Sequence, residues 1–293
     1  MSRRLLLLAL GVVAISCAAV LVRLAEAPPL AVAAFRMLAA SVLLLPVGLL
    51  RAGDEMRHLL RSQWRLLALA GVLLALHFSL WISSLSHTSV ASSVVLVTTT
   101  PLFVALASWA LFRERLRKAT FAGIAISLAG ALFIGYAGLD RGGAALSGNL
   151  LALAAAMAMA GYLLVGRRLR RSAGLLAYSS VVFSVAALVL LFAAIISGTP
   201  FRGYTGTTYI AMLALALVPQ LVGHMSLNWA LRFLPATMVT VAVLGEPVGA
   251  SFLAWTALGE PPTELEVAGG VLMMAGIAFA FLWGGTAPTR PTP

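Results

Sequence analysis

"PLFVALASWALFRE" occupies residues 101–114, and "PVGASFLAWTALGE" occupies residues 247–260. Both stretches begin with proline, carry tryptophan at the ninth position and end with glutamate, within otherwise mostly apolar sequence. The matching residues are 146 positions apart: Pro101 and Pro247, Trp109 and Trp255, Glu114 and Glu260. The same register continues beyond the two stretches, where Gly123 matches Gly269 and Gly130 matches Gly276. The chain of 293 residues therefore contains a repeat of about half its own length.

The composition indicates that lipid surrounds most of the chain. Apolar residues make up 61% of the sequence and charged residues 10%, and the mean hydropathy is +1.03. Soluble domains have about 45–50% apolar and about 25% charged residues, so this chain has too few polar groups to cover its surface in water. The net charge of +11 does not indicate a nucleic-acid partner, because the arginines form short clusters between apolar runs. The single cysteine, Cys17, excludes an intramolecular disulfide, and we predict no metal site.

Long apolar segments predict an all-α membrane protein. A helix needs about 20 mostly apolar residues to cross a bilayer. Ten segments qualify, at roughly residues 5–22, 30–50, 66–85, 89–111, 119–138, 147–166, 174–197, 208–231, 236–258 and 265–284. The basic head "MSRR" leaves a cleaved signal peptide as an alternative for the first segment, and cleavage would leave nine spans.

Lysine and arginine are distributed unevenly between the two sides of this predicted bundle. One side carries sixteen of them: Arg3, Arg4, Arg51, Arg57, Arg61, Arg65, Arg113, Arg115, Arg117, Lys118, Arg167, Arg168, Arg170, Arg171, Arg232 and Arg290. The other side carries only Arg23, Arg141 and Arg202. Because positively charged connections stay in the cytoplasm, we predict that both termini are cytoplasmic.

The repeat and the number of spans together predict two inverted halves around a central cavity. Each half holds five spans, in a first repeat at residues 1–142 and a second repeat at 143–285, followed by a disordered, proline-rich tail at 286–293. Because five is odd, the second half enters the membrane in the opposite direction. Inverted repeats are typical of secondary transporters that alternate between inward-open and outward-open states.

Three features match a known family. These are the ten spans in two halves, the repeated pattern of proline, twelve residues and glutamate before a glycine-spaced helix, and "LAVAAFRMLAASVLLLP" at residues 30–46. Together they resemble the EamA family of the drug/metabolite transporter superfamily. The resemblance implies a bacterial inner-membrane exporter of amino acids, other metabolites or toxic cations. It also places Arg36 at the arginine of the family's first-repeat signature, for which the second half has no equivalent.

Polar residues within the spans are the candidates for a substrate site. "HFSL" at residue 77 and "HMSL" at residue 224 match across the halves with a shift of one position. Residues four apart share a helix face, so one stripe is predicted on each of two spans. The predicted substrate-binding residues on these two spans are His77, Phe78, Trp81, Gln220, His224 and Asn228. The alternative is that these side chains pack between helices without touching substrate.

Two charged residues lie within spans. Glu246 is costly at bilayer depth and is predicted to face the interior, either as a site for a substrate amine or a proton or as a structural hydrogen-bonding group. Arg36 is predicted to have a structural or gating role, for instance in an ion pair with Glu246. Alternatively, its planar fork could clamp a substrate carboxylate.

The repeated prolines predict bends. Pro101 and Pro247 each remove a helical hydrogen bond, which frees the carbonyls of Val97 and Val243, and a gating role follows if the bends let one half close over the substrate. Thr99, in "VTTTP", is a further candidate substrate-binding residue. Its hydroxyl could instead bond a carbonyl of its own helix.

These observations predict a multi-pass inner-membrane exporter of amino acids, neutral or aromatic ones in particular, or of similar small metabolites. No catalytic residue or cofactor is predicted, because the sequence contains none of the serine-hydrolase, zinc-protease or phosphate-loop motifs. The predicted partners are a small molecule and the lipid bilayer, and the oligomeric state is left open, a monomer included. An exporter of toxic organic cations and an intramembrane enzyme acting on lipid-linked substrates are the alternatives.

Overall fold

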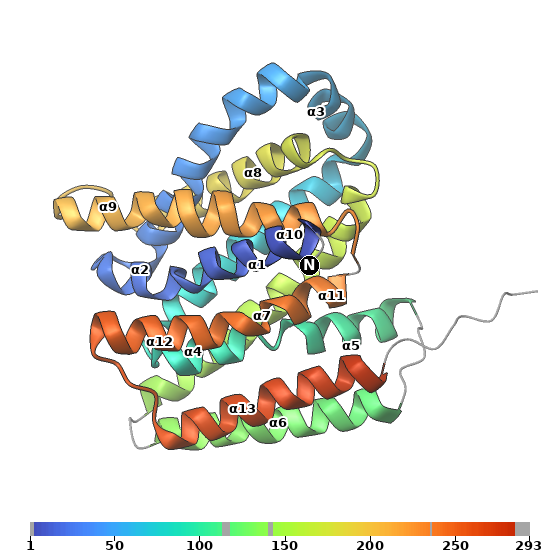
Figure 1. Ribbon diagram of the computed structural model, residues 1–293. Helices are drawn as coiled ribbons and strands as arrows, with labels where there is room; N and C mark the ends of the chain where they lie inside the picture. The colour runs from blue at the N-terminus through green and yellow to red at the C-terminus, as the bar shows by residue number, and fades with distance from the viewer. Residues whose placement is uncertain (1–2, 113–117, 140–142, 235, 285–293) are drawn as a thin grey trace, which may run out of the picture.

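The computed structural model describes residues 3–112, 118–139, 143–234 and 236–284, and every regular element within these ranges is helical (Figure 1). The N-terminal half contains α1 (Arg3–Ser16), α2 (Ala18–Leu24), α3 (Pro29–Ser84), α4 (Val90–Val97), α5 (Thr100–Phe112) and α6 (Lys118–Leu139). The C-terminal half contains α7 (Gly143–Arg170), α8 (Leu175–Ile196), α9 (Gly206–Leu215), the π-helical η1 (Ala216–His224), α10 (Met225–Ala230), α11 (Ala236–Ala242), the 3-10 turn η2 (Val243–Gly245), α12 (Glu246–Leu258), α13 (Glu264–Phe279) and the π-helical η3 (Ala280–Gly284). Glu114 and the predicted tail at 286–293 lie outside the described ranges.

Six helical stretches in the described part of the chain are long and apolar enough to cross a bilayer. One of them is α3, whose 56 residues would extend about 84 Å at about 1.5 Å per residue, far beyond the about 30 Å of a hydrocarbon core. The backbone of α3 leaves the helical region at Ala52 (φ −142°) and Gln63 (φ −136°), which divides it into two long arms and a short helical connection between them. These arms correspond to the predicted spans 30–50 and 66–85. The all-helical membrane class is confirmed, and the count of ten spans remains a prediction.

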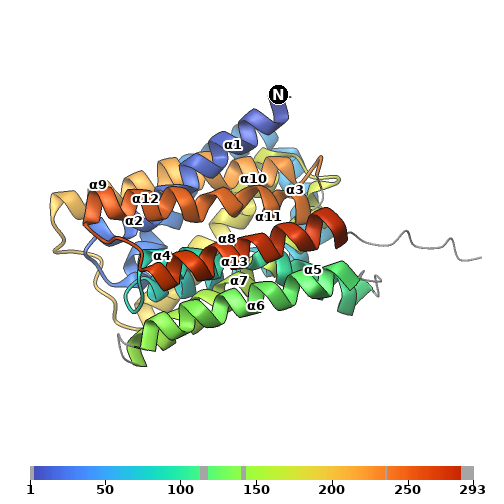
Figure 2. The same ribbon diagram turned by 60° about the horizontal axis from the view of Figure 1, so that its bottom comes forward.

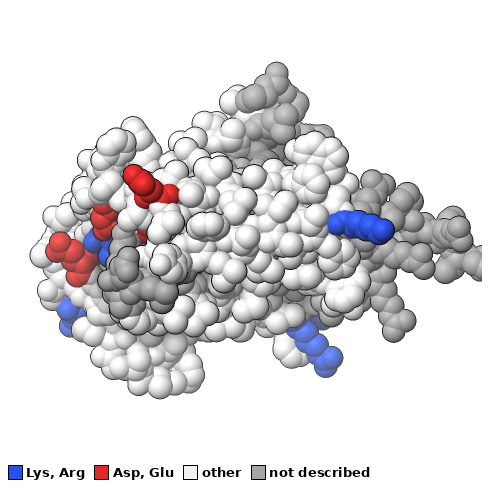
Figure 3. Space-filling view, turned by 90° about the horizontal axis from the view of Figure 1, so that it is seen from below, with Lys and Arg blue, Asp and Glu red and all other residues white. Residues whose placement is uncertain are grey.

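The outside of the bundle is apolar. Large side chains such as Val13, Leu132 and Phe192 are 67%, 74% and 66% exposed, respectively. Figure 3 shows a broad band of uncharged residues across one face, with the acidic side chains of that face gathered at one end. Such a surface is suited to lipid rather than to water, because exposed apolar area of this extent is rare on soluble monomers.

The last helices of the two halves, α6 and α13, lie side by side and run in opposite directions (Figures 1 and 2). A methyl group added at Gly123 would lie 2.5 Å from the carbonyl oxygen of Gly276, and one added at Gly130 would lie 2.5 Å from that of Gly269. Between these contacts, Ser127 Oγ donates a hydrogen bond of 3.1 Å to the carbonyl of Met273, which is its own counterpart in the 146-residue register. Each glycine thus meets the counterpart of the other, which is the contact pattern of a two-fold axis.

Both spans that contain the repeated proline are interrupted just before it. Helix α4 ends at Val97 and α5 begins at Thr100, while α11 ends at Ala242 and the 3-10 turn η2 leads into α12. The carbonyl of Val97 is not left unpaired, because Thr100 Oγ1 donates to it at 2.8 Å. The interruptions are also reciprocal across the halves, since α4 packs on α12 and α5 packs on α11.

Candidate functional site

A small cavity lies within the bundle, and both halves line it. Its polar lining residues are Arg36, His77, Trp81, Thr98, Thr100, His224, Thr240 and Glu246. The remaining lining is apolar, and Phe78, Met159 and Leu227 belong to it. The free space is about 50 Å³, which holds only a few water molecules at about 10–15 Å³ each. The cavity must therefore widen before it admits an organic molecule.

Arg36 is fully buried and only partly bonded. It lies on the first arm of α3, where alanines without exposed area, such as Ala33 and Ala40, let the helix pack closely against its neighbours. Its Nε donates a hydrogen bond of 3.0 Å to Gln220 Oε1, and its guanidinium carbon lies 4.0 Å from the centre of the Phe78 ring. Its Nη1 and Nη2 have no hydrogen-bond partner among the described residues. These two nitrogens can bind one carboxylate through two parallel hydrogen bonds.

Other nitrogen atoms around the cavity are also without a partner in the described part of the chain. They are Trp81 Nε1, Gln220 Nε2 and His224 Nδ1. Buried polar groups normally find a hydrogen-bond partner, so a cluster of unpaired nitrogens is uncommon. Around Arg36 this cluster consists mainly of donors and is suited to an anionic group.

Glu246 is the carboxylate of the cavity and begins α12. The ion pairs among the described residues are Arg23–Glu260 and Arg57–Asp54, so the predicted pair of Arg36 with Glu246 is not formed in this conformation. Instead, Arg36 is held by Gln220 and Phe78. The cavity thus presents a guanidinium and a carboxylate that do not neutralise each other by direct contact.

The two histidines predicted to line a cavity lie close together, with ring centres 6.3 Å apart. His77 Nδ1 is 3.1 Å from the carbonyl oxygen of Ala155. Because a carbonyl only accepts, this contact requires a proton on Nδ1. In neutral His77, Nε2 then carries a lone pair and is an acceptor. Trp81 stacks parallel to the His77 ring, at 6.4 Å between ring centres.

The predicted stripe of Gln220, His224 and Asn228 does not stay on one face of the cavity. His224 lines the cavity, whereas Gln220 lies outside the lining and accepts the hydrogen bond of Arg36 Nε. Asn228 is away from the lining and joins three helices: its Oδ1 accepts from Tyr162 at 2.6 Å and its Nδ2 donates to Ser179 at 3.4 Å. The physical reason is the π-helical η1 around Pro219, which changes the angular spacing of residues four apart.

Thr99 also lies outside the cavity lining. Its Oγ1 donates to the carbonyl of Leu96 at 2.7 Å, as the alternative interpretation of this residue expected. The neighbouring Thr98, Thr100 and Pro101 do line the cavity. Pro247 is not part of the lining, although the residue before it, Glu246, is. Sequence reasoning missed Thr240 and Met159, since neither belongs to a polar stripe or a repeated motif.

An all-helical membrane bundle of two related halves around a buried polar cavity defines a membrane transporter. The comparisons with known proteins agree. The model of the EamA-like transporter family matches the chain twice, at residues 3–136 and 146–282. The chain belongs to this family, and it is a multi-pass inner-membrane transporter rather than an enzyme.

Similar proteins are known from several organisms. The uncharacterized transporter YwfM of Bacillus subtilis is 29% identical over 259 residues, which cover 86% of this chain and 84% of YwfM. The uncharacterized inner membrane transporter YedA of Escherichia coli is 30% identical over 258 residues, which cover 85% of this chain and 80% of YedA. One crystal structure superposes with a TM-score of 0.72 over 96% of this chain and 98% of the other, at 22% identity, and thus shows the same fold.

Proposed function

We propose that the protein exports amino acids, neutral or aromatic ones in particular, or similar small metabolites, by alternating access. The observation that carries this proposal is the state of Arg36. Its two unpartnered nitrogens lie in the same cavity as Glu246, without an ion pair between the two side chains. A zwitterion would place its carboxylate on Arg36 and its ammonium group near Glu246 and the acceptor nitrogen of His77. Apolar lining from Phe78 and Met159 is suited to an uncharged side chain.

The proposed architecture is two inverted five-span repeats, at residues 1–142 and 143–285, with both termini in the cytoplasm. The antiparallel, reciprocal packing of α6 and α13 supports the inversion, because a two-fold axis perpendicular to two membrane helices reverses their direction. Alternating access then consists of opening the cavity first to one side and then to the other. The small volume of the cavity supports a closed conformation between these two states.

An exporter of organic cations is the second candidate, favoured by Glu246 beside the aromatic residues Phe78 and Trp81. Against it stands Arg36, whose positive charge repels a cation in the same cavity. The two candidates therefore make opposite predictions for an Arg36 variant.

The test is counterflow into liposomes that contain the purified protein and an excess of unlabelled compound. We expect radiolabelled leucine or phenylalanine to be exchanged by the native chain, not by Arg36→Gln, and normally by Arg61→Gln, a matched variant of an exposed arginine. Exchange of tetraphenylphosphonium that persists in Arg36→Gln, without exchange of amino acids, would favour the cation exporter. Exchange of amino acids at the native rate by Arg36→Gln would contradict the proposed role of Arg36.

A further inference from the structure

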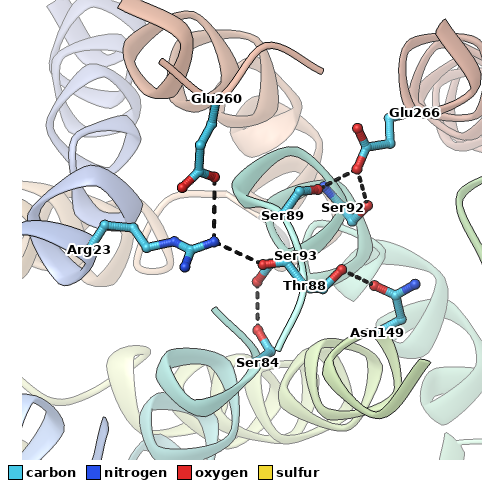
Figure 4. Close-up of polar contacts among 9 residues, drawn as sticks. All are labelled: Arg23, Ser84, Thr88, Ser89, Ser92, Ser93, Asn149, Glu260 and Glu266. Carbon is cyan, nitrogen blue, oxygen red and sulfur yellow. Dashed lines mark hydrogen bonds and ion pairs between the residues drawn. The ribbon is translucent and has the colours of Figure 1, made fainter. Parts of the chain in front are cut away.

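Three groups of polar contacts lie at one end of the bundle, among helix ends and connections from both halves (Figure 4). They comprise Arg23, Ser84, Thr88, Ser89, Ser92, Ser93, Asn149, Glu260 and Glu266, and we call them together the latch. The first half contributes the end of α2, the end of α3, the α3–α4 connection and the start of α4. The second half contributes the start of α7, the α12–α13 connection and the start of α13. The latch therefore joins segments that must separate if this end opens.

Arg23 forms the first part of the latch. Its Nη2 lies 3.4 Å from Glu260 Oε2 and donates to the carbonyl of Thr88 at 3.1 Å. The side chains of Arg23 and Glu260 are 30% and 35% exposed, so the ion pair alone contributes modestly. Its importance is its position, because a single nitrogen connects α2, the α3–α4 connection and the α12–α13 connection.

Hydrogen bonds between the halves form the second part. Thr88 Oγ1 donates to Asn149 Oδ1 at 2.8 Å. Ser92 Oγ donates to Glu266 Oε1 at 2.7 Å, and Ser89 Oγ donates to the same oxygen. Glu266 is only 3% exposed, and hydrogen bonds to a buried carboxylate are stronger than those between neutral groups. The other carboxylate oxygen of Glu266 caps its own helix through Thr263, which fixes its position.

The Glu266 part of the latch is not repeated in the other half. In the 146-residue register, the counterparts of Ser89, Ser92 and Glu266 are Pro235, Met238 and Thr120, none of which carries a carboxylate. Glu260 has an acidic counterpart, Glu114, which lies outside the described residues, and Arg23 is matched by Leu169, or by Arg170 with the one-residue shift of the two histidines. The hydrogen bonds of Glu266 to Ser89 and Ser92 therefore belong to one end only, within an architecture that is otherwise built from repeated parts.

Two hollows in the surface adjoin the latch. They have volumes of about 380 and 590 Å³, and Arg23 and Ser86 belong to the walls of both. The second hollow also contains Thr88 and Glu260 in its wall. The contact of Arg23 with Thr88 and Glu260 thus lies at the boundary of the two hollows, and its loss would let them merge into one opening.

We propose that the latch is the gate of the transporter at this end, and that the cavity opens there only when Arg23 separates from Glu260 and Glu266 separates from Ser89 and Ser92. The gate acts on access to the cavity whatever the substrate is. Weakening it shifts the conformational equilibrium toward the state that is open at the latch end, at the expense of the state that is open at the opposite end.

The test measures access to the cavity from each side of the membrane. Cys17→Ser removes the only cysteine, and Met159→Cys introduces one in the cavity lining. A membrane-impermeant thiol reagent is applied to right-side-out and to inside-out vesicles. The latch side is the one from which a separate cysteine, placed at the exposed Glu264, is labelled. The latch variants are Glu260→Gln, Arg23→Gln and Glu266→Gln, and the control is Glu264→Gln, in the same helix turn as Glu266.

We expect the latch variants to raise the labelling rate of the cavity cysteine from the latch side by about two- to fivefold, and by more for Glu266→Gln, without raising it from the other side. The control should leave both rates unchanged, and the charge swap Arg23→Glu with Glu260→Arg should return the rate toward the native value. Unchanged rates from the latch side, or an equal rise from both sides, would overturn the proposal, because general loosening of the bundle has no sidedness. The readout needs no substrate, so the outcome is independent of the proposed amino-acid specificity.

Discussion

At the scale of the residue, the chemistry of the cavity depends on how Arg36 is held. Gln220 accepts the hydrogen bond of its Nε and Phe78 covers one face of the guanidinium plane, while the two remaining nitrogens have no partner among the described residues. A lysine at this position would keep the charge. It has neither the planar fork nor the stacking surface, so it cannot reproduce this arrangement.

Arg36→Lys should therefore weaken substrate binding more than folding. Loss of one hydrogen bond to a charged group corresponds to about 1.5–3 kcal/mol, so the KM of counterflow should rise about tenfold or more. The amount of monodisperse protein in size-exclusion chromatography should stay near native. A KM that is unchanged in Arg36→Lys would show that the charge alone is sufficient and that the fork geometry is not used.

Asn228 illustrates the opposite case, a polar residue that connects helices. Its side chain bonds Tyr162 and Ser179, and its carbonyl accepts from Arg170 Nε at 3.0 Å. Asn228→Ala should lower stability by about 1–3 kcal/mol, because it removes the hydrogen bonds that this fully buried side chain makes with Tyr162 and Ser179. The melting temperature in detergent measures this loss, and the order of preference among exported compounds should not change.

The matched control for Asn228→Ala is Ser226→Ala. Ser226 lies on the same helix and is not buried, and its one hydrogen bond among the described residues is to the carbonyl of Val222, one turn earlier in η1, at 2.7 Å. Its removal should leave the melting temperature within error of native. A changed substrate preference in Asn228→Ala would instead return this residue to the cavity.

At the scale of the element, the pair α6 and α13 is a contact between the halves in which glycines bring the two backbones close together. Gly130→Ala should destabilise it, because the added carbon meets the Gly269 carbonyl and the backbone of Met273, which cannot move independently. Overpacking of this kind typically costs about 1–3 kcal/mol. Gly143→Ala is the control, since nothing lies within 4 Å of its added carbon.

The repeat provides a second variant that should behave in the same way. Gly276 is the counterpart of Gly130, and its added carbon would lie 2.7 Å from the carbonyl of Gly123. Gly276→Ala should therefore lower the melting temperature by a similar amount. A large difference between the two variants would mean that the two ends of this helix pair are not equivalent in solution.

The sequence predicted the elements better than their internal irregularities. Apolar length and the repeated proline predicted where helices lie and where two of them are interrupted. The helical connection inside α3 was missed, since its inward residues Met56 and Leu59 are too few to mark a helix by pattern alone. The π-helical η1 was also missed, although Pro219 was a signal for it. The assignment of Asn228 to the cavity assumed the four-residue spacing of a regular α-helix, which η1 does not keep.

At the scale of the whole molecule, the distribution of arginines predicts the orientation in the membrane. Cysteines at His58 and Arg171, both exposed, should be inaccessible to an impermeant thiol reagent in intact cells that carry Cys17→Ser. Cysteines at the exposed Gly143 and Arg202 should react. Labelling of Arg171→Cys from outside would contradict the proposed inversion of the second half.

The candidate site could be predicted only in part at this scale. Charge and aromatic character within spans identified Arg36, His77, Trp81 and Glu246, which the structure brings to one cavity. The direct contact of Arg36 with Glu246 could not be judged, because it depends on a few ångströms of side-chain position. The latch was not predicted either, since its serines, Thr88 and Asn149 are ordinary residues of helix ends and connections.

The reciprocal contact of α6 and α13 has an implication for how such a chain arose. Because the contact of α6 with α13 has two-fold symmetry, two identical chains could form it without being joined by a peptide bond. Two separate five-helix chains, inserted in opposite directions, would make it as a homodimer. A homodimer must carry every charged residue twice or not at all. Fusion of the two copies removes this constraint, so that Arg36 and the buried Glu266 of the latch can each exist once, and the two directions of transport need no longer be energetically equal.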